Sequence, residues 1–74
     1  RTLSRAFRAR TGSTPAAWVR EQRLREAQRL LEGTEMPIEQ VAEASGLGSA
    51  VTMRQLFARA LGTTPSEYRR RFQA

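Results

Sequence analysis

Three arginines close to the start of the chain have the spacing of side chains that share one face of a helix. Arg1, Arg5 and Arg8 stand at i, i+4 and i+7, which brings them together at about 100° per residue. The apolar residues of the same segment fall on the opposite side: Leu3, Ala6 and Phe7. Guanidinium groups bind phosphate, and the O6 and N7 atoms of guanine, through paired hydrogen bonds. Because the stripe contains no acid, it favours contact with nucleic acid over a merely solvated basic face.

A second helical stripe, fifty residues later, carries different chemistry. It consists of Val51, Gln55 and Ala58, with Arg54 and Arg59 beside it. Glutamine can bond adenine through two hydrogen bonds, and a valine side chain can meet the methyl group of thymine. We therefore expect a half-site that prefers guanine under the first helix and one that prefers A and T under the second.

The composition favours binding over catalysis. All 13 basic residues are Arg, all seven acidic residues are Glu, and the net charge is +6 over 74 residues. Since the sequence has no Cys, His or Asp, it excludes a disulfide framework, a Cys/His zinc site and a nucleophile that depends on thiolate or imidazole. The glutamates are scattered at solvated helical spacings, so we expect no enzymatic activity, no metal and no cofactor. A basic module of this size favours a polyanionic partner.

The two stripes belong to two copies of one pattern. Residues 2–20 and 52–70 align without a gap and share Phe, Gly and Thr-Pro at equal positions. In each copy a glycine fits the residue after a helix, where a left-handed conformation costs it little, and a Thr-Pro pair fits the N-cap and first position of the next helix. These residues are Gly12, Thr14 and Pro15 in the first copy and Gly62, Thr64 and Pro65 in the second. Each copy therefore predicts helix, stop, helix.

Around these copies the periodicity predicts an all-α domain over residues 1–74. We expect a first recognition helix over 1–12, a linker helix over 14–33, a second helix-turn-helix over 38–61 and a C-terminal helix over 64–74. The linker helix is roughly 27 Å long, and its arginines and glutamates are expected to form a solvated face of mixed sign. The residues that it is expected to bury are Leu24, Ala27, Leu30 and Leu31.

Further expectations concern the ends and the core side of these helices. Gly33 is expected to end the linker helix, Ser49 to cap the second recognition helix, and Thr64 to form a capping box with Glu67. The expected core stripe of the second recognition helix is Met53, Leu56, Phe57, Ala60 and Leu61.

Nearly the whole chain resembles the C-terminal DNA-binding domain of AraC/XylS-family bacterial transcription regulators. The resemblance rests on the segments RTLSRAFRARTGSTPAAWVREQRLREAQRLL, PIEQVAEASGLGS and FARALGTTPSEYRRRF. It implies two homeodomain-like helix-turn-helix units joined by one long helix, with two recognition helices in successive major grooves of double-stranded DNA. The implied function is sequence-specific DNA binding for transcription regulation, in the bacterial cytoplasm and in association with the nucleoid.

The same resemblance assigns the DNA contacts. The implied base-facing residues are Arg1, Ser4 and Arg5 in the first recognition helix and Ala50, Val51, Thr52, Arg54 and Gln55 in the second. The implied phosphate contacts are Arg8, Thr14, Arg59 and Thr64, and the two threonines act at helix N-termini. Related members often carry Arg where this chain has Gln55, so a guanine contact is not expected there.

The first copy lacks the lead-in helix that precedes the second copy, and the sequence begins with Arg1. We therefore expect residue 1 to be an internal cut in a longer parent, and these 74 residues alone to bind DNA weakly or without specificity. The parent is expected to contact RNA polymerase in promoter or operator complexes and to dimerise through a preceding domain.

Two other functions remain open from the residues alone. A basic helical module could bind an acidic protein partner, or it could lie on an anionic membrane surface. The Thr-Pro caps, the paired glycines and the repeat argue against the membrane, and no apolar run approaches the ~20 residues of a membrane span. Dependence of binding on duplex sequence would separate DNA from an acidic protein partner.

Overall fold

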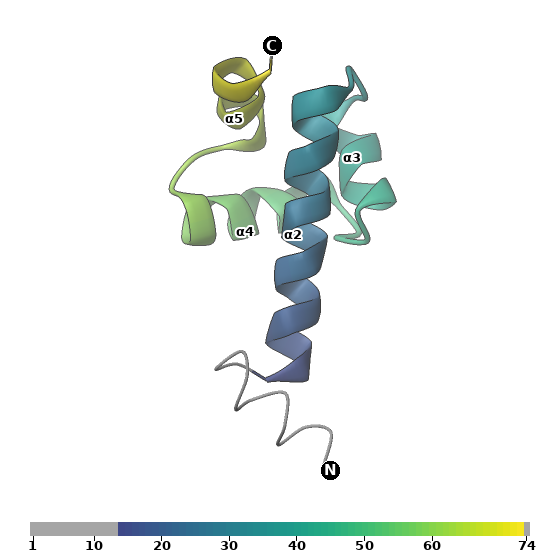
Figure 1. The fold of residues 1–74 in the computed structure, drawn as a ribbon, viewed down its shortest axis with the longest axis vertical. Helices are drawn as coiled ribbons and strands as arrows, with labels where there is room; N and C mark the ends of the chain where they lie inside the picture. The colour runs from purple at the N-terminus through teal and green to yellow at the C-terminus, as the bar shows by residue number, and fades with distance from the viewer. Residues whose placement is uncertain (1–13, 74) are drawn as a thin grey trace.

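The computed structural model describes residues 14–73, and these form four α-helices without a strand (Figure 1). The helices are α2 (Pro15–Gly33), α3 (Ile38–Ala44), α4 (Ala50–Leu61) and α5 (Pro65–Phe72). α2 has 19 residues and is therefore roughly 28 Å long. The expected all-α class is confirmed for this part of the chain, whereas the recognition helix expected over 1–12 lies outside it. None of the described helices combines the length and hydropathy needed to cross a membrane.

Three helices begin at the hydroxyl residues that the sequence indicated. Each of these N-caps has an extended backbone, and its side-chain oxygen accepts a hydrogen bond from a backbone N–H three residues later, at 3.0–3.2 Å. The caps are Thr14, Ser49 and Thr64. The reciprocal half of the capping box differs from expectation, because the carboxylate of Glu67 binds Arg70 at 2.5 Å instead.

The helix ends agree with the sequence in part. Gly62 ends α4 in the left-handed conformation, with φ 68°, as its position predicts. α2 also ends at Gly33, as expected; Gly33 is its last helical residue, and Thr34, whose backbone is extended, is the C-cap. The Thr34 hydroxyl donates to the Leu30 carbonyl at 2.7 Å, so a side chain serves the helix end in place of a left-handed glycine. α5 ends at Phe72, with Gln73 as its cap, and so stops short of residue 74.

The turn between α3 and α4 depends on two glycines with positive φ. Gly46 has φ 87° and Gly48 has φ 94°. The N–H groups of Leu47 and Gly48 both donate to the Ala42 carbonyl, at 2.9 and 3.1 Å, which closes the end of α3. A Cβ atom at position 46 would stand 3.1 Å from Nε of Arg23 on α2. Glycine is therefore favoured there chiefly by its conformation, and its missing Cβ also leaves room for the Arg23 side chain.

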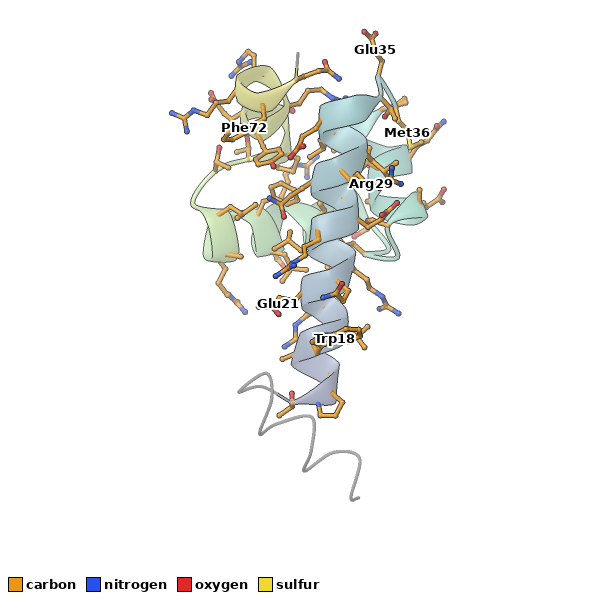
Figure 2. All side chains as sticks on the ribbon, viewed as in Figure 1. Trp18, Glu21, Arg29, Glu35, Met36 and Phe72 are labelled. Atoms are coloured by element: carbon orange, nitrogen blue, oxygen red, sulfur yellow. The ribbon has the colours of Figure 1, made fainter. Side chains whose placement is uncertain are left out.

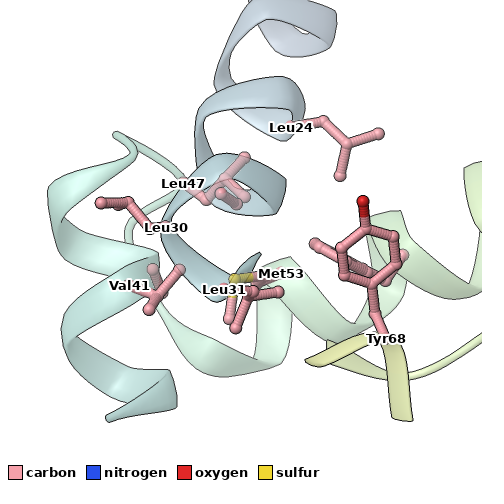
Figure 3. Packing of buried hydrophobic residues seen from close by; sticks show 10 residues of the cluster. Leu24, Leu30, Leu31, Val41, Leu47, Met53 and Tyr68 are labelled. Atoms are coloured by element: carbon pink, nitrogen blue, oxygen red, sulfur yellow. The ribbon is translucent and has the colours of Figure 1, made fainter. Parts of the chain in front are cut away.

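The core lies where α3, α4 and α5 meet the C-terminal half of α2 (Figures 1 and 3). α2 buries the four residues that the sequence predicted. The cluster consists of Leu24, Ala27, Leu30, Leu31, Val41, Ala42, Leu47, Met53, Phe57 and Tyr68. The side chains along the N-terminal half of α2, around Trp18 and Glu21, have no other described helix beside them (Figure 2).

The predicted core stripe of α4 is right for its middle and wrong for its end. Met53 and Phe57 are buried and Leu56 is partly buried, but Ala60 and Leu61 are exposed. The last turn of α4 extends away from α2, as Figure 1 shows, so the other described helices cover its core-side residues only in part; Leu61 retains 38% of its accessible area. Helical periodicity gives the direction of a side chain but not the length over which a neighbouring helix covers it.

α5 is fixed to the end of α2 by an aromatic and polar contact. The Tyr68 hydroxyl donates to Oε2 of Glu32 and accepts from Nε2 of Gln28 at 3.1 Å. Its ring meets Phe57 edge-on, with centroids 5.8 Å apart, and Phe72 at 4.6 Å. Burial, followed by the hydrogen bond to Glu32, raises the pKa of the Tyr68 hydroxyl above its ordinary value. The neutral phenol is therefore the form that this packing requires.

Candidate nucleic-acid interface

The outer face of α4 carries most of the residues that the sequence proposed for base contact. Val51, Thr52, Arg54 and Gln55 are all exposed, and Val51 retains 58% of its accessible surface. Met53 and Phe57 anchor the opposite side of the helix in the core. This anchoring fixes the direction of the outer face. One apolar, two polar and one charged side chain are therefore exposed on the same surface. Whether they contact bases stays a prediction.

Ala50 does not belong to this surface. It retains only 2% of its accessible area, so its methyl group lies in the interior and cannot face a groove. The expectation that its side chain contacts bases is therefore wrong. Its position in the first turn of α4, directly after the Ser49 N-cap, places it on the core side of the helix, about one turn before Met53 and two turns before Phe57.

The outer face of α4 is electrostatically uncompensated. Its cations, Arg54 and Arg59, form no ion pair or hydrogen bond with any described residue, and α4 contains no acid. Elsewhere in residues 14–73 arginines do find carboxylates: Arg29 binds Glu26 through two hydrogen bonds, at 3.0 and 2.6 Å. That hydrogen bonding lowers the pKa of Glu26 and raises the pKa of Arg29. The outer face of α4 thus keeps its positive charge available for an external anion.

The hydroxyl groups at the helix starts have a defined hydrogen-bond state. Ser49 Oγ accepts from the backbone N–H of Thr52 and donates to Thr52 Oγ1, both at 3.2 Å. The Thr52 hydroxyl therefore has its own hydrogen free to donate outward. Thr14 and Thr64 are exposed, and their oxygens accept backbone N–H groups, so each likewise retains one O–H donor for a phosphate oxygen.

The C-terminal arginines are a different case, which the sequence did not separate from the others. Nε and Nη2 of Arg69 donate to the carbonyls of Leu31 and Thr34, at 3.2 and 3.0 Å. The side-chain amide of Gln73 donates to the same two carbonyls, at 3.2 and 2.6 Å. Both side chains thus satisfy the unpaired carbonyl groups at the C-terminus of α2. The periodicity of α5 alone gave no signal for these contacts, which join residues 35–42 apart in the sequence.

Four of the expected contact residues lie outside the described residues: Arg1, Ser4, Arg5 and Arg8. They remain predictions from the sequence. The structure therefore brings together only the second of the two expected recognition surfaces, with Arg59 at its C-terminal end.

The sequence is similar to those of known helix-turn-helix proteins. A helix-turn-helix domain family matches residues 1–71. The HTH-type transcriptional regulator Rv1931c of Mycobacterium tuberculosis is 36% identical over 72 residues, which are 97% of this chain and 28% of that protein. The HTH-type transcriptional activator RhaR of Yersinia pestis is also 36% identical over 72 residues, which are 97% of this chain and 25% of RhaR. The chain thus spans about a quarter of the length of these curated relatives.

Two solved structures share the fold. The DNA-binding domain of AdpA, crystallised with a target DNA, superposes with a TM-score of 0.87 at 42% identity, covering 96% of this chain and 64% of that one. The xylose-binding transcription activator xylR superposes with a TM-score of 0.91 at 29% identity, covering 99% of this chain and 19% of that one.

Proposed function

The chain belongs to the AraC-type helix-turn-helix domain family, and from this membership we propose that it binds double-stranded DNA with sequence specificity in the regulation of transcription. The observation that carries the proposal is the outer face of α4, which is open, free of acids and fixed in direction by its buried opposite side. The major groove of DNA, about 12 Å wide, admits an α-helix, so a helix that follows a tight turn can insert such a face into it. The AdpA domain, which has the same fold, was crystallised with a target DNA.

Within this proposal the residues of α4 have distinct roles. Gln55 pairs with adenine, Val51 meets a thymine methyl group, and Thr52 and Arg54 contact neighbouring base edges. Arg59 and the helix starts at Thr14 and Thr64 bind phosphates, which carry affinity but no sequence information. The segment 1–12 is the first recognition helix, with Arg1, Ser4 and Arg5 on bases and Arg8 on phosphate. α2 joins the two elements and, at roughly 28 Å, suits major grooves about 34 Å apart.

The proposal extends to the context of the chain. We place it with DNA in the bacterial cytoplasm, where the longer protein contacts RNA polymerase and dimerises through another domain. No catalytic step is assigned to it. Within residues 14–73 no group of three or more acidic, His or Cys side chains is arranged to hold a metal ion.

Binding-site selection from random duplexes tests this function, with the full natural polypeptide that carries these 74 residues. We expect an enriched site with two half-sites about one helical turn apart. Gln55→Ala should relax the base preference at one position, because a bidentate contact is worth about 1–3 kcal/mol of discrimination.

Arg59→Ala is the matched control for that variant, since it removes a side chain of the same helix that we assign to phosphate. It should weaken all duplexes alike and reduce the slope of log K against log salt by about 0.9. Recovery of no preferred sequence would contradict the proposal. Equal loss of affinity for all duplexes in Gln55→Ala would show that Gln55 reads no base.

A further inference from the structure

The four arginines of α2 fall on two sides of the helix. At about 100° per residue, Arg20 lies about 20° from Ala27 and Leu31, which are both fully buried against the rest of the core. Arg25 and Arg29 point about 140° and 180° away from Arg20. Arg20 therefore continues, one turn beyond the core, the side of α2 that packs on the helix-turn-helix. The charged residues of α2 therefore do not form one solvated face, as the sequence suggested, but lie on two sides of the helix.

Arg20 is exposed and uncompensated. The core along α2 begins at Leu24, and the N-terminal half of the helix extends past α4 (Figure 1). All seven glutamates of the chain lie within residues 14–73, and none of them forms an ion pair or a hydrogen bond with Arg20. Arg29, on the far side, is by contrast paired with Glu26. The two sides of α2 thus differ in the charge that they leave available.

Arg23 supports the same division. Its aliphatic stem passes over the turn at Gly46, with Nε 3.1 Å from where a Cβ of that residue would lie. Its guanidinium is therefore held on the helix-turn-helix side of α2, about 60° from Arg20. It also forms no ion pair with a described carboxylate. Because Arg23 packs on the turn as well, Arg20 is the cleaner residue for a test.

The depth of the major groove relates this side of α2 to DNA. Packed helices have axes about 8–10 Å apart, so α2 stands one such spacing behind α4. The major groove is about 8.5 Å deep. When α4 lies in the groove, the side of α2 that faces α4 is therefore about as far from the groove floor as the phosphates that border the groove. Arg20, beyond the end of the core, then lies over the backbone between the two grooves that the recognition elements occupy.

We propose that Arg20 binds DNA phosphates between the two major grooves, and that α2 is thereby a contact element of its own as well as a spacer. This inference rests on the proposed DNA binding. It assigns a sequence-independent contact to a helix that was expected to be a solvated connection. It also explains why the side of α2 toward the helix-turn-helix carries arginines without acids, while the glutamates Glu21, Glu26 and Glu32 lie on other sides.

Salt titration of duplex binding, with the full natural polypeptide and its selected site, tests the contact. Arg20→Gln is compared with Arg25→Gln, which removes the same charge from the far side of the same helix. We expect Arg20→Gln to reduce the slope of log K against log salt by about 0.9 and to weaken binding about eightfold at 0.1 M salt, with base preferences unchanged. Arg25→Gln should leave the slope unchanged. Hydroxyl-radical protection between the half-sites should weaken in Arg20→Gln alone.

The outcomes separate this inference from the proposed function. If the unaltered protein binds no duplex, the proposed function fails and the inference fails with it. If it binds its site, but the two variants reduce the slope equally, only the general charge of α2 matters and the Arg20 contact is wrong. Thermal unfolding provides the structural control, and both variants should keep the unfolding temperature of the unaltered protein, because both side chains are exposed.

Discussion

The two arginines of α4 differ from Arg69 and Arg70 of α5 in that the fold gives them no partner among residues 14–73. Arg54 and Arg59 project from α4 without any described partner, whereas Arg69 is bound to the carbonyls that end α2 and Arg70 to Glu67. The net positive charge of the sequence therefore overstates the charge that can meet DNA. An arginine that lies next to a helix C-terminus is attracted by its unpaired carbonyl groups. When that helix is distant in the sequence, local sequence patterns do not reveal the contact. Local positive charge marks a binding surface only where the fold leaves it unmatched.

The largest effect that would test this contrast is expected at Arg69. Arg69→Ala removes two hydrogen bonds to the Leu31 and Thr34 carbonyls and the charge that faces the end of α2. We expect the free energy of unfolding to fall by about 2 kcal/mol, because hydrogen bonds from a charged donor contribute about 1.5–3 kcal/mol. Urea unfolding followed by circular dichroism measures it.

Arg71 is the matched control for Arg69. It lies two residues away on α5 and is exposed, with no bond to any described residue. Arg71→Ala should change the free energy of unfolding by less than about 0.5 kcal/mol. Equal destabilisation by both variants would show that the charge of α5, and not the specific capping of α2, is what matters.

Tyr68 should have the next largest effect, because it joins α5 to α2 on the same side as Arg69. Tyr68→Phe removes the hydrogen bonds to Glu32 and Gln28 and keeps the ring packing, so we expect a loss of about 1 kcal/mol. The pKa of the Tyr68 hydroxyl is higher in the folded than in the unfolded state. The contribution of this hydroxyl to stability is therefore complete below about pH 10, the ordinary tyrosine value, and is lost as pH rises through its folded-state pKa.

Both halves of that expectation can be measured. Tyr68 is the one tyrosine of the sequence, so phenolate absorbance reports its titration alone. The unfolding temperature of the unaltered protein should fall more steeply above pH 10 than that of Tyr68→Phe. Parallel pH profiles for the two proteins would contradict the link between this hydroxyl and the stability of the fold.

Among the residues of α5 that have a described partner, the smallest effect is expected at Arg70. Its pair with Glu67 is exposed on both sides, at 70% and 60% of side-chain area, and spans i and i+3 of one helix. Arg70→Ala should lower the free energy of unfolding by no more than about 0.5 kcal/mol, and 0.5 M NaCl should remove the difference. A loss as large as that of Arg69→Ala would remove the distinction between the two arginines.

Much of the fold followed from short-range features of the sequence. The caps at Thr14, Ser49 and Thr64 and the left-handed end at Gly62 depend on hydrogen bonds between residues at most four apart. Such features are present in any window that contains them. The buried stripe of α2 was equally predictable, because one helix face is apolar over two full turns.

The two errors on α4 have different causes: local periodicity already contradicts the assignment of Ala50, whereas the error at Leu61 concerns neighbours that are distant in sequence. Ala50 was assigned to the outer face of α4 and Leu61 to its core side, yet Ala50 is buried and Leu61 retains 38% of its area. The wheel places Ala50 on the same side as Met53 and Phe57, and it gives Leu61 the right direction. It carries no information on where the covering helices α2, α3 and α5 begin and end. For the candidate site the residue types and the direction of each side chain follow from the sequence, while the extent to which other helices cover them does not.

The sequence by itself determined the all-α class, the residues at which the helices begin and the types of side chain along each helix face, because backbone geometry and capping are local. Tertiary structure alone decided which arginines keep an open charge. Arg69 is bound because α5 returns to the end of α2, and Arg20 is exposed because the core of α2 begins one turn later, at Leu24. Both outcomes depend on where one helix stops covering another, which is a property of packing between distant segments.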